Sequence, residues 1–299
     1  MGDGGVVLER RVEPLGILSV PERKFRAAFE MVTAEWRARY QALPAIASGM
    51  IGSAQGWVEA PYTSLPADVG SVAHSLATVP DVGLRIVPGL AQRGEAPDVM
   101  RGEETQLFGA MIEYSGLAEG GTAVLPGTHA KWARVDGGRI VGFTTYMTGE
   151  LFAVLARHSI LGRLAPPGAG DVEPGAAFAR GVRHARDAAG GLASVIFSAR
   201  SAVLAGDLRA EDSLEYLSGM LIGDEVRAGL SAGDRPRVLI GEPALCARYA
   251  AAFAEFGVGD IAIGGDTAPA GLWEIARRAF PELQRADRSS RKPVSDDAN

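Results

Sequence analysis

The sequence is poor in cysteine and has no long apolar run. Its single cysteine, Cys246, excludes an internal disulfide framework and suits a reducing compartment. No apolar run approaches the ~18 residues of a membrane-spanning helix, and residues 1–20 lack the apolar core of a signal peptide. We therefore expect a cytoplasmic protein without a membrane partner.

Basic residues are outnumbered by acidic ones, so no nucleic-acid partner is expected. The 299 residues include 30 Lys and Arg against 36 Asp and Glu, a net charge of -6, and no basic patch accumulates. The length fits two lobes of ordinary domain size. We expect small molecules as partners, and the sequence leaves open whether the chain forms a homo-oligomer.

Several common catalytic motifs are also missing. No lysine follows a glycine, which excludes the G-x-x-x-x-G-K-[ST] phosphate loop, and no G-x-G-x-x-G lies between a strand and a helix. G-x-S-x-G and H-E-x-x-H do not occur, and the histidines are scattered. Hydrolase, dinucleotide-binding and zinc functions therefore have little support.

Strand and helix patterns alternate along the chain and predict an α/β protein. We expect strands at 4–12, 44–50, 83–90, 235–242 and 260–266, and a three-strand meander at 121–147. We expect helices at 21–41, 101–116, 176–189, 211–230, 244–257 and 268–280, and a further helix that starts at Thr148. Residues 165–175 are typical of a linker and the tail 285–299 of disorder.

The first turn of the meander has residues that suit a phosphate. Gly127 lets backbone N–H groups approach an anion, and Thr128 adds a hydroxyl. Lys131, one of only three lysines in the chain, offers a point charge. An ordinary β-turn with a surface lysine explains these residues about equally well.

Two later strand-to-helix junctions also combine glycine with an acidic residue. One is Gly241-Glu242, and the other is Gly264-Gly265-Asp266-Thr267. A flat ring or a ribose fits against glycine backbone, and helix N-termini favour phosphates. Each junction is a weak signal by itself, but three such turns in one half of the chain indicate a nucleotide cleft.

The first half contains adjacent carboxylates, Glu103 and Glu104, beside Arg101. One carboxylate would serve as a general base toward a substrate hydroxyl, and Arg101 would hold a substrate carboxylate. Acidic residues also suit a helix N-terminus without any catalytic role.

The glycine-rich loop before this helix is a second candidate substrate site. Gly49 and Ser53 would admit a polyhydroxy substrate close to the backbone, with Trp57 beside them. A structural turn with Trp57 packed in the core is equally compatible with the sequence.

Six blocks together resemble the 2-dehydro-3-deoxygalactonokinase family of bacterial sugar-acid kinases: SGMIGSAQGWVEAPY, VMRGEETQLFGA, LPGTHAKW, TYMTGELF, LSGMLIGDEV and GEPALCARY. The resemblance implies the actin-like ATPase fold, with ribonuclease-H-like lobes at 1–117 for the sugar acid and 118–284 for the nucleotide. It implies transfer of the γ-phosphoryl of ATP, with Mg²⁺, to the terminal hydroxyl of 2-dehydro-3-deoxy-D-galactonate in galactonate catabolism.

The resemblance also implies roles for the candidate residues. The ATP phosphates would meet the turn and the helix after the meander: Gly127, Thr128, His129, Lys131, Thr148, Gly149 and Glu150. The adenosine side would meet Gly241, Glu242, Gly264, Gly265, Asp266 and Thr267. Glu103 or Glu104 would be the catalytic carboxylate, with Glu103 preferred, and the sugar acid would meet Gly49, Ser53, Trp57 and Arg101.

The sequence departs from the family pattern at two places. Leu125 stands where the wider superfamily has an aspartate, so the metal ligands stay unassigned. The start, Met1 to Gly5, resembles the turn after the family's first strand, so we expect a first lobe that lacks this strand and its phosphate turn. The alternatives are a kinase of another keto-deoxy or aldonic acid, or a non-catalytic binding protein for a sugar acid or nucleotide.

Overall fold

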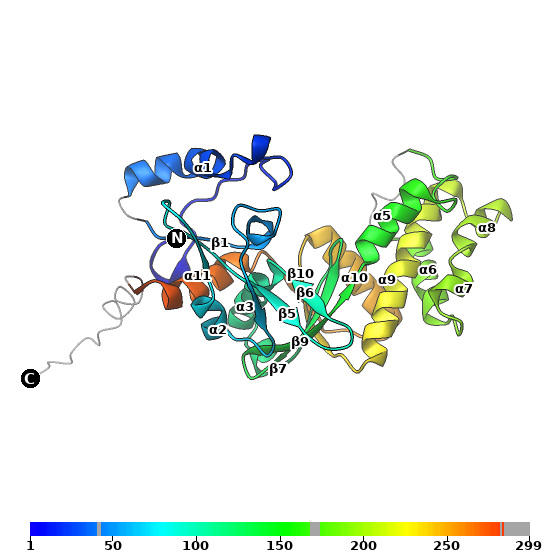
Figure 1. The fold of residues 1–299 in the computed structure, drawn as a ribbon. Helices are drawn as coiled ribbons and strands as arrows, with labels where there is room; N and C mark the ends of the chain where they lie inside the picture. The colour runs from blue at the N-terminus through cyan, green and yellow to red at the C-terminus, as the bar shows by residue number, and fades with distance from the viewer. Residues whose placement is uncertain (41–42, 168–173, 282, 284–299) are drawn as a thin grey trace, which may run out of the picture. The chain divides into compact units, whose positions relative to one another are not determined.

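The computed structural model describes residues 1–40, 43–167, 174–281 and 283. The chain forms two compact units. The first comprises Met1–Glu113, Arg139–Val141 and the residues from Thr267 on, and the second comprises Tyr114–Gly138 and Gly142–Asp266. Both units combine strands and helices, which confirms the α/β class (Figure 1). The tail 285–299 and most of the expected linker lie outside the described residues.

The first unit is built on two small mixed sheets. Its strands are β1 (Ala45–Ala47), β2 (Tyr62–Ser64), β3 (Ala77–Val79), β4 (Leu84–Ile86), β5 (Gly89–Gln92) and β6 (Asp98–Met100), in the orders β1-β4-β3 and β2-β5-β6. Its helices are α1 (Phe25–Arg39), α2 (Val69–His74), α3 (Glu103–Glu113) and α11 (Ala268–Ala279). No helix in the described ranges is both long and apolar enough to cross a membrane.

Two strand expectations in the first unit are wrong. Residues 6–12 have no regular structure, and Val6, Leu8 and Val12 are exposed because no described strand pairs with them. The single strand expected at 83–90 is divided into β4 and β5, with Pro88 in the gap. Proline has no backbone N–H to donate to a neighbouring strand, so the ladder stops there.

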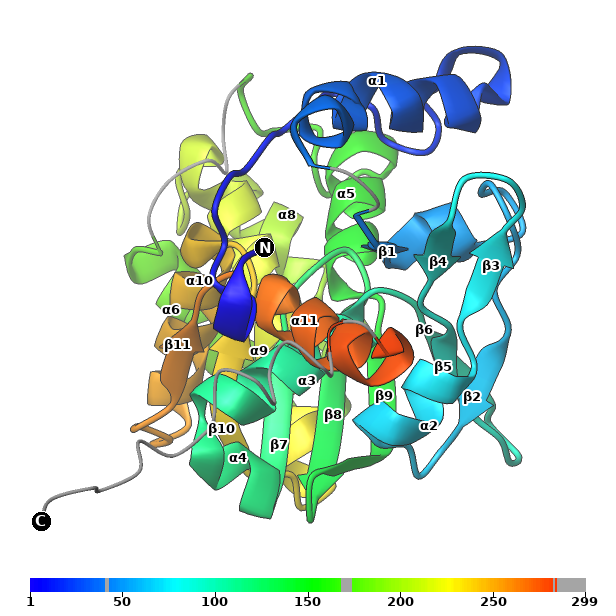
Figure 2. The same cartoon turned by 90° about the vertical axis from the view of Figure 1, so that its left-hand side faces the viewer.

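Helices α3 and α11 lie side by side in the first unit because glycines allow close contact (Figure 2). A Cβ on Gly109 would lie 1.8 Å from the carbonyl oxygen of Thr267, and one on Gly271 would lie 1.9 Å from that of Thr105. Any side chain at either position would push the helices apart. This contact holds the N-terminal turn of α3, which carries Glu103 and Glu104.

The second unit contains a five-stranded sheet in the order β11-β10-β7-β8-β9. Its strands are β7 (Gly120–Leu125), β8 (Ala130–Asp136), β10 (Pro236–Ile240), β11 (Ala262–Gly264) and β9 (Arg139–Tyr146), whose residues from Gly142 on belong to this unit. Its helices are α4 (Ser115–Glu119), α5 (Thr148–His158), α6 (Ala176–Arg186), α7 (Leu192–Val195), α8 (Ser198–Leu204), α9 (Ser213–Ser231) and α10 (Pro243–Glu255). These elements confirm the expected meander and the helices that follow it.

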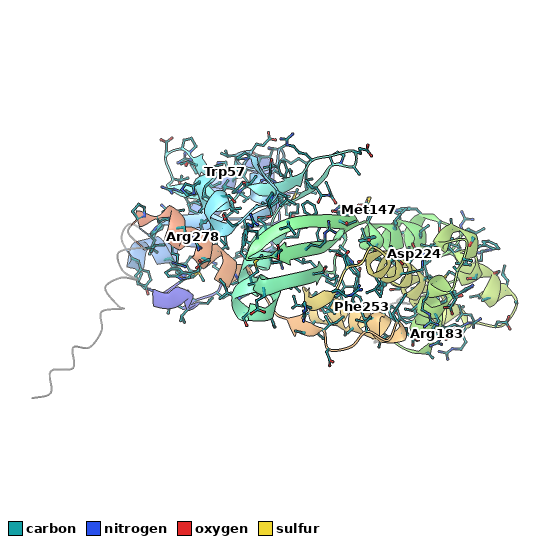
Figure 3. The ribbon with its side chains drawn as sticks, turned by 90° about the horizontal axis from the view of Figure 1, so that it is seen from below. Trp57, Met147, Arg183, Asp224, Phe253 and Arg278 are labelled. Carbon is teal, nitrogen blue, oxygen red and sulfur yellow. The ribbon has the colours of Figure 1, made fainter. Side chains whose placement is uncertain are left out.

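The helices of the second unit pack on the sheet through a continuous apolar core. Trp132 of β8 is fully buried, and its ring lies 5.6 Å from that of Phe253 on α10, which Figure 3 labels. Helices α6 and α9 lie side by side (Figure 1). A Cβ on Gly219 of α9 would lie 2.1 Å from the carbonyl oxygen of Phe178 on α6, so this contact also requires glycine.

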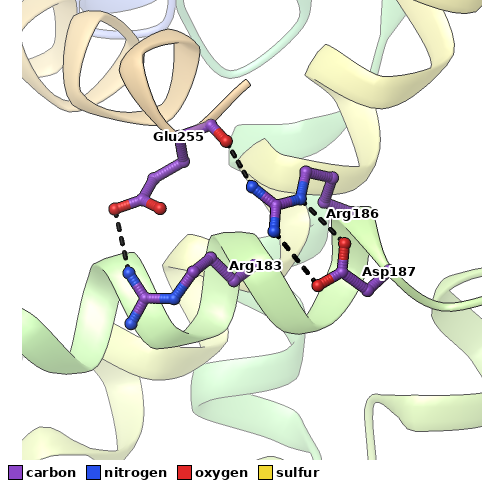
Figure 4. A network of polar contacts seen from close by, with 4 residues as sticks. All are labelled: Arg183, Arg186, Asp187 and Glu255. Carbon is purple, nitrogen blue, oxygen red and sulfur yellow. Dashed lines mark hydrogen bonds and ion pairs between the residues drawn. The ribbon is translucent and has the colours of Figure 1, made fainter. Parts of the chain in front are cut away.

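A surface ion-pair network ties the end of α6 to the end of α10 (Figure 4). Arg183 Nη1 lies 3.0 Å from Glu255 Oε1, and Arg186 Nη1 donates to the carbonyl oxygen of Glu255. Arg186 also pairs with Asp187, Nε to Oδ1, at 2.8 Å. Exposed pairs of this kind contribute little energy each, about 0–1 kcal/mol. They connect α10 to α6, and residues of α10 line the candidate site described below.

Candidate functional site

The three glycine junctions predicted from the sequence meet at one edge of the sheet in the second unit. Strands β7, β10 and β11 are parallel, so their carboxyl ends lie together. Gly241, after β10, approaches the turn after β7, since a Cβ there would lie 3.4 Å from the carbonyl oxygen of Pro126. Open α/β sheets bind ligands at this edge. The three junctions are far apart in the sequence, but the parallel strands bring them close together in space.

The turn at Gly127 and Thr128 lies against the first turn of α5. Glu150 N donates to the carbonyl oxygen of Thr128 at 3.0 Å, and His129 Nε2 lies 2.5 Å from Glu150 Oε2. A Cβ on Gly149 would lie 2.5 Å from the carbonyl oxygen of Gly127. The expected residues of the turn and of α5 thus form one continuous surface.

The side chain of Lys131 is buried and hydrogen-bonds to the backbone of this turn. It is 4% exposed, and its Nζ donates to the carbonyl oxygen of His129 at 3.0 Å. The ammonium therefore closes the turn and places a positive charge next to it. The surface position that an ordinary β-turn would give this lysine does not occur.

A cavity of about 240 Å³ opens beside the turn. Its polar lining is formed by Gly127, Thr128, Thr148, Gly149 and Ser218. Its remaining lining comes from three helices: Phe152, Leu221, Ile222, Leu245 and Tyr249. Polar groups at one part of an otherwise apolar wall are typical of sites for small molecules and cofactors.

A buried carboxylate, Glu225, connects two of the lining residues. Trp132 Nε1 donates to Glu225 Oε1 at 2.7 Å, and Tyr249 OH donates to Oε2 at 2.7 Å. The hydroxyl of Thr148 donates to the same Oε2. Burial raises the pKa of Glu225, and the three donors oppose that shift. Burial also raises the pKa of Tyr249, which stays a phenol.

The residues expected on the adenosine side differ in their exposure and in their hydrogen bonds within the protein. The Glu242 carboxylate caps α10 by accepting from the backbone N–H groups of Ala244 and Leu245, at 3.1 and 2.8 Å. It therefore occupies the place that an anion would take at this helix end. Gly264 is buried, whereas Gly265 and Asp266 are exposed at the sheet edge.

Thr267 belongs to the first unit by its contacts. It is fully buried, and its hydroxyl donates to the carbonyl oxygen of Gln106 at 2.7 Å. This hydroxyl is engaged in packing α11 on α3, so we do not include Thr267 in the nucleotide site proposed below.

The two glutamates at the start of α3 differ in burial. Glu103 is half-buried, and its Oε2 accepts from Arg101 N at 3.0 Å. Glu104 is fully buried, and its Oε2 accepts from Gly102 N at 2.7 Å. Its Oε1 has no hydrogen-bond partner among the described residues. Burial raises the pKa of Glu104 to about 8.

Arg101 is held in place but retains unused donors. Its guanidinium lies 4.4 Å from the centre of the Tyr62 ring, and Nη2 donates to the carbonyl oxygen of Ala60 at 2.8 Å. Nε and Nη1 are buried and have no partner in the described part of the chain. Two buried donor nitrogens without partners are costly, and an anion would satisfy them.

In the loop at Gly49, Ser53 and Trp57, two of the expected substrate contacts are engaged within the protein. Ser53 Oγ donates to the carbonyl oxygen of Met50 at 2.8 Å, and Trp57 packs on Phe29 at a ring distance of 5.8 Å. Gly49 approaches the Arg101 segment, since a Cβ on Gly102 would lie 3.2 Å from the Gly49 Cα. The loop therefore lies next to Arg101.

The apolar half of the cavity and Glu225 were not predicted from the sequence. Phe152, Leu221 and Ile222 look like ordinary core residues in the sequence, and only the fold shows that they line a cavity. Glu225 did carry a signal, because it is a carboxylate within the mostly apolar run of α9. A buried charge at such a position requires partners.

Comparison with known proteins identifies the relatives of this chain. A family model described as 2-keto-3-deoxy-galactonokinase matches residues 1–275. A protein from Rhizobium meliloti (strain 1021), described as a probable 2-dehydro-3-deoxygalactonokinase, is 38% identical over 94% of this chain and 93% of its own length. The 2-dehydro-3-deoxygalactonokinase of Escherichia coli (strain K12) is 37% identical over 91% of each.

A solved structure agrees with these relatives. It is the crystal structure of a protein from Sinorhizobium meliloti with the provisional assignment 2-dehydro-3-deoxygalactonokinase. The two structures superpose with a TM-score of 0.87. The crystallised protein is 35% identical to this chain, and the match covers 94% of both chains.

Proposed function

Because the chain belongs to the 2-keto-3-deoxy-galactonokinase family, we propose that it transfers the γ-phosphoryl of ATP to the terminal hydroxyl of 2-dehydro-3-deoxy-D-galactonate. The observation that carries the nucleotide part is the cavity lined by the Gly127-Thr128 turn and the start of α5. In this proposal the fold is the actin-like ATPase fold, and the protein works in the cytoplasm in galactonate catabolism.

The second unit would bind ATP at the carboxyl edge of its sheet. The backbone of Gly127 and Thr128 would receive phosphate oxygens, and the buried Lys131 would stabilise their charge. The nucleoside would lie toward the apolar wall. Gly241, Gly265 and Asp266 would border it, while Glu242 keeps the end of α10 closed to phosphate.

Magnesium would enter as part of the nucleotide. No group of three His, Cys, Asp or Glu side chains that could hold a metal occurs among the described residues. This fits Mg²⁺, which is commonly held by substrate phosphates, waters and one or two carboxylates. When bound it neutralises phosphate charge, and we assign no side chain to it.

The first unit would bind the sugar acid and remove its proton. The unused donors of Arg101 would satisfy the substrate carboxylate, beside the loop of Gly49, Ser53 and Trp57. Glu103, the more accessible of the two glutamates, would accept the hydroxyl proton as the oxygen attacks phosphorus. Phosphoryl transfer depends mainly on such positioning and on charge stabilisation.

A coupled assay of ADP release with a panel of acids tests this function. We expect 2-dehydro-3-deoxy-D-galactonate to give the highest kcat/KM among keto-deoxy and aldonic acids of both configurations. A higher value for another acid would support the first alternative, a kinase of a related substrate. Binding of acid and ATP without ADP release would support a non-catalytic binding protein.

A further inference from the structure

Glu225 determines the hydrogen-bonding role of two hydroxyls in the cavity wall. A hydroxyl has one proton to donate and oxygen lone pairs that accept. Thr148 and Tyr249 both line the cavity, and both direct their proton to Glu225 Oε2. Only their lone pairs remain for a ligand, so this part of the wall accepts hydrogen bonds and does not donate them.

The groups of a nucleotide also differ in whether they donate or accept hydrogen bonds. Phosphate oxygens are acceptors and gain nothing from a lone pair, whereas ribose hydroxyls and the purine amino group are donors. We propose that Glu225 is a positioning residue that makes Thr148 and Tyr249 select a donor group of the nucleoside, leaving the phosphates to the Gly127-Thr128 turn. This inference rests on the proposed function, since it requires a nucleotide in the cavity.

Trp132 makes the inference testable with one substitution. The indole N–H is a donor only, and it faces Glu225 Oε1. In Glu225→Gln the amide oxygen must therefore face Trp132, and the amide NH2 must face Thr148 and Tyr249. Both hydroxyls then accept from the amide and turn their protons to the cavity. The change keeps side-chain length and shape but inverts the polarity of the wall.

The decisive measurement compares ADP with inorganic pyrophosphate by calorimetry. Loss of one or two hydrogen bonds predicts that Glu225→Gln weakens ADP binding about tenfold or more. Pyrophosphate affinity should stay the same or increase, because new donors face the site. A merely structural role would weaken both ligands together, and that result, like unchanged ADP affinity, would overturn the inference.

Asp224→Asn provides the matched control. Asp224, labelled in Figure 3, precedes Glu225 on α9. Its Oδ1 pairs with Arg227 Nη2 at 2.5 Å, and it is not among the residues that line the cavity. The substitution makes the same change of charge one residue away. The ratio of ADP to pyrophosphate affinity should remain that of the wild type.

Single-hydroxyl variants keep the test valid if Glu225→Gln does not fold, which near-UV circular dichroism would reveal. Thr148→Val and Tyr249→Phe each remove one acceptor, and at least one should weaken ADP about five- to tenfold without affecting pyrophosphate. Tyr216→Phe is the control, because Tyr216 is equally buried but bonds to His184 and Ser198 outside the cavity. Unchanged ADP affinity in both test variants would overturn the inference.

Nucleotide analogues identify the donor. We would measure 2′-deoxy-ADP, 3′-deoxy-ADP and purine riboside 5′-diphosphate, each of which lacks one donor group of the nucleoside. The wild type should discriminate against one of them, and the variant that lacks the matching hydroxyl should not. No discrimination by the wild type would contradict selection by this wall. Failure of the wild type to bind ADP or pyrophosphate would instead reject the proposed nucleotide site itself.

Discussion

Glu225 in the second unit and Glu104 in the first are both buried glutamates on helices, and burial raises the pKa of both. Their surroundings differ. Glu225 accepts from three side chains, whereas Glu104 accepts from Gly102 N and leaves Oε1 without a partner among the described residues. A buried acceptor without a partner lowers the stability of the folded protein. Such a group in a native structure therefore calls for an explanation, such as a role in function.

Two cations, the buried Lys131 and the half-buried Arg101, show the same contrast. Lys131 in the second unit donates to a backbone carbonyl of its own turn. Arg101 in the first unit has two buried guanidinium nitrogens, Nε and Nη1, without a partner in the described chain. The second unit thus has a site whose polar groups are arranged before a ligand binds, whereas the first unit has polar groups that a ligand would still have to satisfy.

The largest expected effect concerns the base and sharpens the contrast within the first unit. Glu103 is more accessible than Glu104, so we expect Glu103→Gln to lower kcat by about 10²–10⁴-fold, the usual contribution of general acid–base catalysis. The KM for ATP should change little. Steady-state kinetics with both substrates would measure this.

Glu104→Gln is the comparison for that prediction. Neighbours on a helix point about 100° apart, so the two carboxylates have different surroundings, and we expect a smaller loss of kcat for Glu104→Gln. A larger loss for Glu104→Gln would reverse the assignment. If both variants kept wild-type turnover, the base would lie elsewhere.

Lys131 tests whether the second unit's cation acts on the ligand or only on its own turn. We expect Lys131→Ala to lower kcat by about 10²–10³-fold, as for the loss of one preorganised donor in other enzymes. Lys131→Gln can still donate to the carbonyl oxygen of His129 but has no charge. Continued low turnover in this variant would indicate that the charge acts on phosphate.

The controls for Lys131 separate the two explanations. Near-normal turnover of Lys131→Gln would mean that turn closure is sufficient, and near-normal turnover of Lys131→Ala would exclude the phosphate role. Lys24→Ala removes an exposed lysine paired with Glu22 at 2.7 Å and should leave turnover unchanged.

The raised pKa of Glu104 gives a prediction about stability and pH. Its pKa is about 8 in the folded protein against 4.5 for the ordinary group, so the folded state binds more protons between these values. Stability contributed by the neutral carboxyl is therefore lost as pH rises from about 4.5 to 8, on the order of a few kcal/mol. Glu104→Gln should remove this slope.

Denaturant unfolding of wild type and variant across that pH range would measure the effect. Glu113→Gln, on the exposed part of the same helix, is the control and should keep the wild-type slope. Parallel pH profiles for wild type and Glu104→Gln would contradict a buried glutamate that resists ionisation.

The sequence predicted the glycine turns better than their surroundings, for a physical reason. Gly127, Thr128 and Gly149 belong to short motifs that can be recognised in the sequence, and the structure brings them to one cavity. Tyr249 joins them only through tertiary packing, because α10 follows the Gly127-Thr128 turn at a long distance in the sequence. The strand expected at 4–12 does not form because a strand requires a neighbouring strand, which the residue pattern of one segment cannot predict.

The smallest expected effect concerns Arg101, the first unit's counterpart of Lys131. Its unused donors predict that Arg101→Ala raises the KM for the sugar acid about tenfold, the value of one charged hydrogen bond, with kcat and the KM for ATP within a few-fold. Arg85 is a matched control in the same unit. Its guanidinium lies 4.5 Å from the centre of the Phe280 ring, and Nη1 donates to the carbonyl oxygen of Ala279 at 2.7 Å.

Arg85 and Arg101 thus each have one aromatic and one carbonyl partner, but of the two only Arg101 has buried donors without a partner among the described residues. If Arg101 serves packing alone, both alanine variants should lower thermal stability similarly and leave the KM unchanged. If it binds the substrate carboxylate, only Arg101→Ala should raise the KM, and an uncharged, esterified substrate should bind wild type and variant equally. Equal KM values for the acid in wild type and Arg101→Ala would show that the partner of these donors is not the substrate.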